Sequence, residues 1–154
     1  MNDTFFMQQA IKRAKKAALI GEVPIGAVIV KDGVIIASGY NLREKKSNSL
    51  LHAEIIAIEK ACKKLSAWRL EDCTLYVTLE PCPMCAGAVI NSRIKRVVFG
   101  GYDHKAGVYG SVFNITNYAF NHKYEVLGGV LEKECTKLLS DFFTQLRTNK
   151  RGNK

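Results

Sequence analysis

The order of the expected helices and strands in this 154-residue chain predicts an α/β domain, with a central mixed five-stranded sheet between two layers of helices. Strand-forming runs alternate with amphipathic helical segments, a pattern that favours a sheet covered on both faces. The first two strands follow one another across a short turn, so part of the sheet is expected to be antiparallel. Because 47% of the residues are hydrophobic, the chain can bury one core, and we expect a single domain over residues 1–154.

Four segments with an apolar face predict the helices. Asp3 or Thr4 can cap the first helix, and Gly21 is expected to end it. Ser49 is expected to cap the second helix. Pro83 is well placed to begin the third, because the first helical position does not need an N–H group. The expected helices span about residues 4–20, 50–65, 84–91 and 131–146.

Five short β-rich runs predict the strands. Lys31-Asp32-Gly33 is typical of a turn that joins the first two as a hairpin. The fourth run is nearly all apolar, as a strand covered on both faces should be. Residues 101–121 are rich in Gly, Asn and Tyr and predict a functional loop with at most one short helical turn. The expected strands span about residues 25–30, 34–38, 73–79, 96–100 and 124–127.

The charge of the chain favours a polyanionic partner. Lysine and arginine outnumber aspartate and glutamate by 23 to 14, which gives a net charge of +9. A charge of this size attracts polyanions, and nucleic acid is the commonest polyanion in a cytosol. No acidic residue follows Asp141, so residues 147–154 are expected to form a basic tail that can be flexible. Such a tail can be a solubilising end or an arm that contacts RNA.

Several features indicate a cytosolic protein with no membrane partner. No apolar run approaches the roughly 18 residues of a membrane span, and the first residues lack the pattern of a signal segment. The five cysteines are an odd number, and disulfides are not expected in a reducing compartment. Cys62, Cys73 and Cys135 lie among apolar residues, where cysteine usually serves as a small buried hydrophobe.

Two short motifs supply candidate metal ligands. Cys82 and Cys85 are three residues apart at the start of a helix, which places both sulfurs on one side of its first turn. The free N–H groups and the positive end of the helix favour the thiolate form there. Together with His52 they give zinc three protein ligands. Structural zinc sites normally have four, so a set of three leaves one position for water, as in catalytic sites.

Glu54 lies two residues after His52 and is not needed as a ligand. Zinc lowers the pKa of a bound water to about 7, which makes hydroxide available at neutral pH. Hydrolysis with such a water also requires a proton to be taken from the water and protons to be delivered to the substrate and its leaving group. A carboxylate at Glu54 can do this as general base and then general acid. His104 and His122 are interpreted as non-ligands.

Either motif alone is weak evidence. A Cys-x-x-Cys pair is as often structural as catalytic, and a single histidine on an apolar helix is more often a core residue than a ligand. The combination of His-x-Glu at one helix start with Pro-Cys-x-x-Cys at another, directly after a strand, is the pattern of zinc deaminases that act on nucleobases.

The sequence resembles the bacterial tRNA-specific adenosine deaminase (TadA) family, within the cytidine deaminase superfamily, over nearly its whole length. Besides the two metal motifs, the similar stretches include GEVPIGA at 21–27, LYVTLEPC at 75–82, MCAGA at 84–88 and RVVFG at 96–100. The resemblance implies a cytidine deaminase-like fold, one zinc ion per subunit held by His52, Cys82 and Cys85, and Glu54 as the proton shuttle. It also implies a homodimer that converts adenosine to inosine at the wobble (first anticodon) position of tRNA. The expected partner is the anticodon stem-loop of an arginine tRNA with an ACG anticodon.

The resemblance also implies which residues bind the substrate. Asn41 falls on the position that orients the target nucleotide, beside Ile25 and Ala53. The positions associated with the anticodon loop are Arg43, Arg69, Asp103, Lys105 and Phe143. Taken alone, Asn41 could instead be a turn residue, and Phe143 could serve in core or dimer packing.

Two other functions fit part of the same pattern. A deaminase of a free base, nucleoside or nucleotide, such as guanine, cytidine or deoxycytidylate, could have the same metal site, but the charge and the flanking stretches favour RNA. A zinc-stabilised RNA-binding module without activity would not need Glu54 beside the metal. The chain departs from the family at 48–51, which reads NSLL where members often have DPTA. It also departs at 108–109, where members tend to have small residues, and both departures bear on which tRNA is recognised.

Overall fold

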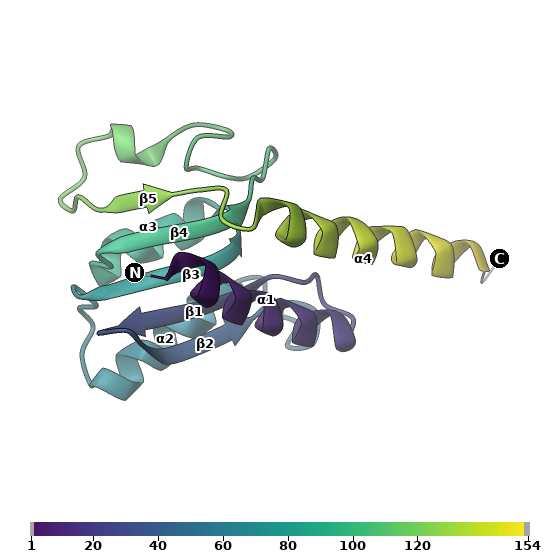
Figure 1. Ribbon diagram of the computed structural model, residues 1–154, viewed down its shortest axis with the longest axis horizontal. Helices are drawn as coiled ribbons and strands as arrows, with labels where there is room; N and C mark the ends of the chain where they lie inside the picture. Colours follow the sequence, from purple (N-terminus) through teal and green to yellow (C-terminus); the bar gives the residue numbers. More distant parts are fainter. Residues whose placement is uncertain (1, 153–154) are drawn as a thin grey trace.

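The computed structural model describes residues 2–152, and side chains over 2–150, and within this range it contains a five-stranded sheet and four α-helices (Figure 1). No described helix is long and apolar enough to cross a membrane. In chain order the elements are α1 (Asp3–Leu19), β1 (Gly26–Lys31), β2 (Val34–Tyr40), α2 (Ala53–Leu65), β3 (Cys73–Leu79), α3 (Pro83–Ser92), β4 (Arg96–Gly101), the 3₁₀ turn η1 (Ile115–Asn117), β5 (Glu125–Leu127) and α4 (Glu132–Gly152).

The sheet is mixed, as the sequence predicts. The strand order is β2-β1-β3-β4-β5, with β1 antiparallel to both of its neighbours and β3, β4 and β5 parallel to one another. Asp32 and Gly33 join β1 to β2 and have φ values of +51° and +74°. Two successive residues with positive φ match the right-handed twist of the flanking strands, so the expected hairpin is confirmed.

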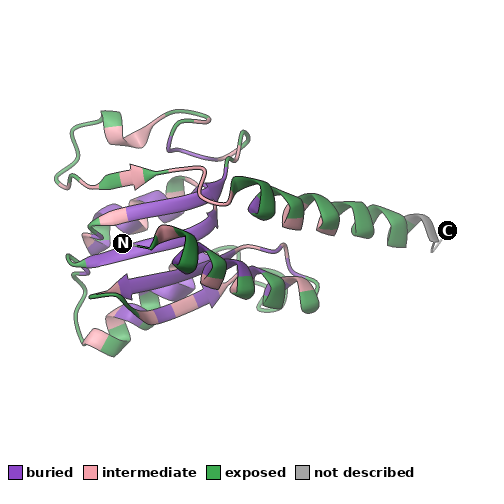
Figure 2. Ribbon diagram, viewed as in Figure 1, coloured by how far each residue is buried: buried purple, intermediate pink, exposed green. Residues whose placement is uncertain are grey.

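The helices form the two outer layers of the predicted three-layer fold. On one face of the sheet, Ile29, Leu75 and Val77 pack against apolar residues of α2 and α3. On the other face, Tyr76 and Val98 pack against α1 and the first turns of α4. Side chains alternate between the two faces along each strand, which is why a strand such as β3 is buried on both sides (Figure 2).

The second helix begins later than the sequence predicts. Its N-cap is His52, so the expectation that Ser49 caps a helix from about residue 50 is wrong. The Asn48 side chain instead accepts a hydrogen bond from the backbone N–H of Leu50 at 3.0 Å. Asparagine side chains of this kind compete with helix formation by satisfying the backbone locally. His52 is therefore left in an extended conformation just outside the helix.

The two terminal helices also differ from expectation. Asn2, rather than Asp3 or Thr4, caps α1 by accepting the N–H of Phe5 at 2.9 Å. The last helix extends to Gly152 instead of ending near residue 146, so residues 147–152 of the expected basic tail belong to α4, while 153–154 lie outside the described residues. The absence of Gly and Pro between Glu132 and Gly152, and acidic residues in the first turn, favour the longer helix.

The Asp3 carboxylate ties the start of α1 to β3 and β4 of the sheet. It accepts hydrogen bonds from Arg96 Nη1 and Nη2 at 2.7 and 2.9 Å, and from the Tyr76 hydroxyl at 2.7 Å. The hydrogen bond from Arg96 is the largest cause that lowers the pKa of Asp3 below its usual value. A carboxyl with a lowered pKa in the folded state stabilises the fold above its unfolded pKa and loses that effect as the pH falls.

We therefore expect Asp3→Asn to lower the free energy of unfolding by about 1.5–3 kcal/mol at pH 7, the usual contribution of a hydrogen bond to a charged group. The difference from the wild type should shrink below about pH 4, where the wild-type carboxylate becomes protonated. Urea unfolding at several pH values measures both effects. Asp32→Asn, in the exposed hairpin turn, is the matched control. A deficit of the Asp3 variant that stayed constant from pH 7 to pH 3 would contradict the electrostatic origin.

Candidate active site

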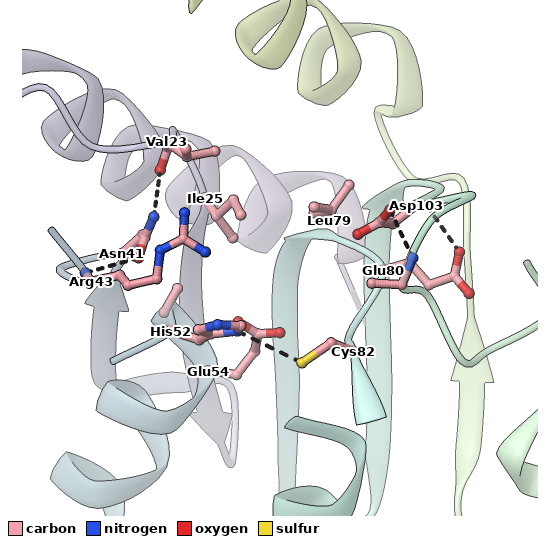
Figure 3. Close-up of a pocket in the computed structure, with 12 residues that line it drawn as sticks. Val23, Ile25, Asn41, Arg43, His52, Glu54, Leu79, Glu80, Cys82 and Asp103 are labelled. Carbon is pink, nitrogen blue, oxygen red and sulfur yellow. Dashed lines mark hydrogen bonds between the residues drawn. The ribbon is translucent and has the colours of Figure 1, made fainter. Parts of the chain in front are cut away.

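A pocket of about 210 Å³ lies where β3 ends and where α2 and α3 begin (Figure 3). It is formed by segments that are distant in the sequence, because the α1–β1 loop, the β2–α2 loop, the β3–α3 connection and the β4–β5 loop meet at this end of the sheet. Its lining consists of Val23, Ile25, Asn41, Arg43, His52, Ala53, Glu54, Leu79, Glu80, Cys82, Asp103 and Ala106.

Two helix starts bring the three candidate ligands together. Cys82 is the N-cap of α3 and Cys85 lies in its first turn, with Pro83 at the first helical position as predicted. His52 is the N-cap of α2. A Cβ added at Gly39 of β2 would lie 2.6 Å from the carbonyl oxygen of Ala53, so glycine there allows the start of α2 to approach the sheet.

The geometry of the three side chains fits a zinc ion. His52 Nδ1 lies 3.7 Å from Cys82 Sγ and 3.6 Å from Cys85 Sγ, and the three ligand atoms lie within 4.8 Å of one another. Tetrahedral zinc, with bonds of about 2.3 Å to sulfur and about 2.0 Å to nitrogen, places such atoms roughly 3.5 Å apart. Among the described residues, no other group of three or more His, Cys, Asp or Glu side chains is close enough together to hold a metal.

Neighbouring side chains favour the thiolate form of one of the two cysteines. A hydrogen bond from Cys85, with a further one from His52, lowers the pKa of Cys82 to about 4. The same bond to Cys82, together with burial, raises the pKa of the Cys85 thiol. The pair therefore shares one proton, and a bound cation would replace that proton and favour two thiolates.

Glu54 lies in the first turn of α2, next to the ligand set but outside it. Its side chain is buried and lines the pocket. Burial raises the pKa of Glu54 to about 7, and the negative charge of Cys82 acts in the same direction. A carboxyl whose pKa lies near neutrality can both accept and donate a proton at physiological pH.

Five of the expected substrate-binding residues line this pocket: Ile25, Asn41, Arg43, Ala53 and Asp103. Asn41 is buried, and its amide is oriented by two hydrogen bonds. Its Nδ2 donates to the Val23 carbonyl at 3.3 Å, and its Oδ1 accepts the N–H of Arg43 at 3.1 Å (Figure 3). Asn41 is thus held in a turn, and its amide remains able to make one further hydrogen bond through each of its polar atoms.

Three other expected residues do not line the pocket. Lys105 is exposed in the turn that follows Asp103. Arg69 lies beyond the C-terminal end of α2, and a helix of 13 residues separates the two ends by about 20 Å. There its guanidinium pairs with Glu71 at 3.1 Å and lies over the Trp68 ring. Phe143 is on α4 and is 40% exposed.

The structure adds four lining residues that the sequence analysis did not select, namely Val23, Leu79, Glu80 and Ala106. A charged residue directly after the apolar strand β3 was the only available signal for Glu80. His104 is exposed, and His122 Nε2 lies 2.7 Å from the Ile94 carbonyl oxygen, so neither belongs to the metal group.

Comparison with known proteins agrees with this geometry. Residues 1–147 match the family model of MafB19-like deaminases. A tRNA-specific adenosine deaminase of Bacillus subtilis is 56% identical over 97% of this chain and 94% of its own length. The chain belongs to the tRNA-specific adenosine deaminase family. A solved structure from work on A-to-I editing by tRNA:A34 deaminases at the wobble position superposes on this deaminase with a TM-score of 0.84. That match has 41% identity and covers 88% of this chain and 99% of the other.

The deaminase also resembles a solved guanine deaminase from Bacillus subtilis, with a TM-score of 0.63 and 45% identity over 66% of each chain. The cytidine deaminase-like fold is therefore shared by proteins whose substrates differ.

Because only three side chains form the metal group, we expect Cys85→Ala to abolish stoichiometric metal binding. Elemental analysis of the purified protein measures this directly. Cys62→Ala, at a partly buried free cysteine outside the group, is the matched control and should keep its metal. Stoichiometric metal in the Cys85 variant would rule out this ligand set.

Proposed function

We propose that this protein hydrolyses the 6-amino group of the adenosine at the first anticodon position of a tRNA, giving inosine and ammonia. The observation that carries the proposal is Glu54, a buried carboxyl with a pKa of about 7 beside a His-Cys-Cys group in a pocket. The pocket volume of about 210 Å³ is below the roughly 300–1,000 Å³ of sites for drug-sized ligands, which suits a single base.

Glu54 carries the proton transfers of the proposed reaction. Zinc held by His52, Cys82 and Cys85 would supply a Lewis acid that lowers the pKa of a water to about 7. Glu54 takes one proton from the attacking water and delivers it to the ring nitrogen. It then takes the remaining proton from the hydroxyl group that has been added to the ring carbon and delivers it to the departing amine. The oxygen of the water becomes the carbonyl oxygen of inosine, and the amino group leaves as ammonia.

The pocket must receive a base that has left its stack. A base inside a duplex cannot enter such a site, whereas an anticodon loop presents unpaired bases. Asn41 would orient the nucleotide through the N–H and the lone pair that its own turn leaves available. Ile25 and Ala53 would form the apolar contacts to the ring.

Exposed basic residues near this end of the sheet support an RNA substrate. Arg43 lies at the pocket and Lys105 in the neighbouring turn, and both are exposed. Helix α4 extends away from the end of the sheet at which β3 and β4 end (Figure 1). It carries the exposed Arg147 and Lys150. The net charge of +9 favours association with phosphates, and a cytoplasmic arginine tRNA with an ACG anticodon is the proposed substrate.

We further propose that the protein acts as a homodimer with one zinc per subunit. Arg69 lies beyond the C-terminal end of α2, too far to reach the pocket of its own subunit at the other end of that helix. In a dimer whose two subunits share each RNA site, Arg69 and Phe143 could contact the RNA that occupies the partner's pocket.

The direct test is incubation with transcribed arginine tRNA bearing an ACG anticodon, followed by sequencing, in which inosine is read as guanosine. We expect conversion at the first anticodon position by the wild type. Glu54→Gln should keep its zinc and its affinity for tRNA but lose about 10²–10⁴-fold in turnover, because the proton shuttle is removed. Efficient deamination of free guanine, cytidine or adenosine, with none in tRNA, would favour the small-molecule reading.

A second prediction concerns the end of α4. Removing residues 147–154 should weaken binding of the anticodon stem-loop and flatten its dependence on salt, because each lost phosphate contact lowers the slope by about 0.7–0.9. Affinity measured over a salt series tests this. The control replaces Lys12, Lys15 and Lys16, three exposed residues of α1, by glutamine and should have a smaller effect. Unchanged affinity and slope after truncation would make the end of α4 a solubilising segment.

A further inference from the structure

Glu80 is a buried carboxylate that binds one loop through both of its oxygens. It directly follows β3, two residues before Cys82, and is 2% exposed. Its Oε1 accepts the backbone N–H of Asp103 at 3.1 Å and the hydroxyl of Ser111. Its Oε2 accepts the backbone N–H of Tyr109 at 2.8 Å and that of Ser111 at 3.3 Å. The loop over residues 103–111 therefore encloses the carboxylate.

The contact between the loop and the carboxylate is close. A Cβ added at Gly107 would overlap the carboxyl group of Glu80, so the loop can pass over it only with glycine at this position. The adjacent Pro81 carbonyl accepts the N–H of Val108 at 3.0 Å, which adds a further bond between the two segments. The segment that leads from β3 to Cys82 thus also fixes the loop.

This loop forms one wall of the pocket. Asp103 and Ala106 line the cavity, and Asp103 Oδ1 accepts the N–H groups of Lys105 and Ala106 at 3.1 and 3.2 Å. A continuous series of hydrogen bonds therefore runs from Glu80 through Asp103 to the turn that carries Ala106 and Lys105. The position of Glu80 determines the position of that turn.

The opposite wall is held in the same way by Glu22, which is 1% exposed. Its carboxylate accepts the backbone N–H of Glu44 at 3.0 Å and of Lys45 at 2.9 Å, in the loop that begins with Asn41. Figure 3 places Asn41 and Arg43 on one side of the pocket and Glu80 and Asp103 on the other.

Charged side chains are almost never fully buried without partners, because removal from water is costly. Among the described residues, the buried charged side chains are Glu22, Glu54 and Glu80, and all three belong to this site or to the loops around it. Glu54 is assigned to proton transfer. The other two are satisfied by backbone N–H groups of the loops that they hold.

We propose that Glu80 is a positioning residue for deamination: it fixes loop 103–111 in the shape that receives the target nucleotide, before RNA binds, while Glu22 does the same for the loop that carries Asn41. This role rests on the proposed function. Because a preformed wall places the base relative to Glu54, loss of the Glu80 contacts lowers the rate of the bound substrate more than it lowers affinity for RNA.

Glu80→Gln tests the role of the carboxylate at constant volume. Each oxygen of Glu80 faces at least one backbone N–H, so either orientation of the amide sets its NH₂ group against a donor. We expect the single-turnover rate on an anticodon stem-loop to fall by about 10–100-fold, because a misplacement of about 1 Å can cost about 10²-fold in rate. Zinc content and stem-loop affinity should stay close to wild type. Amide hydrogen exchange should become faster over 103–111 and not in β3.

Glu134→Gln, the same change at an exposed glutamate of α4, is the matched control and should leave every measurement unchanged. Loss of zinc or unfolding of the whole domain in the Glu80→Gln protein would make Glu80 a general structural residue and overturn the proposal. Faster exchange in the loop with an unchanged rate would overturn it as well, because the loop would then be held without consequence for the reaction.

A double-mutant cycle tests the contact from the other side and does not depend on Glu80→Gln folding well. Gly107→Ala should slow the wild-type enzyme, because the new Cβ displaces the carboxylate. The same change should have little effect in a Glu80→Ala background, where the obstructing carboxylate is gone. Additive effects of the two substitutions on the rate would contradict the proposal.

These outcomes are distinct from failure of the proposed function. A wild-type enzyme that deaminates a free base but no stem-loop would refute the tRNA substrate alone. The rates of the same variants would then be measured on that base, and the same losses would be expected if Glu80 positions the pocket wall.

Discussion

The site depends on one geometric constraint, the convergence of a histidine and two cysteines, whose ligand atoms lie within 4.8 Å of one another at the starts of two helices. The parallel pair β3–β4 and its connecting helix place Cys82 and Cys85 at one end of the sheet. His52 reaches them only because α2 begins late and approaches β2 closely at Gly39. The rest of the fold holds these two helix starts together at the same end of the sheet.

Acidic and basic side chains occupy different parts of the site. The pocket and its supports contain buried acidic groups, whereas the surface around it and the outer part of α4 carry exposed basic residues. Buried carboxylates bonded to backbone N–H groups can lie close to a polyanion, because each is already compensated locally. Exposed lysine and arginine provide the long-range attraction. A basic protein can thus keep a proton-accepting carboxyl with a pKa near 7 in a site that receives RNA.

The sequence predicts the chemistry of the site better than its surroundings, for a physical reason. The proposed metal ligands and proton shuttle are specified by residue type and short spacing, so His52, Glu54, Cys82 and Cys85 could be selected as candidates without coordinates. The caps at Ser49 and Asp3 were wrong because competing side-chain contacts decide helix starts: Asn48 bonds its own turn, and Asp3 bonds Arg96 of β4. Glu80 escaped selection because its partners are backbone N–H groups 23 to 31 residues away, which no sequence pattern records.

The same reasoning indicates where specificity resides within this fold. A guanine deaminase resembles this chain, so the fold alone does not select the substrate. The candidate metal ligands lie at the starts of two helices, whereas the walls of the pocket come largely from loops. One of these loops is also anchored in the core, through Val108 and Tyr109. Changes in the sequence of such loops disturb the fold less than changes in helices or strands do. The loops can therefore accommodate a different base. Their shape must nevertheless be fixed, because a wall that moved would misplace the base relative to Glu54. Buried carboxylates next to the loops meet both requirements, since they bond mainly to backbone N–H groups and so do not restrict exposed loop side chains such as Lys105. Gly107 is the exception, because a side chain there would overlap Glu80.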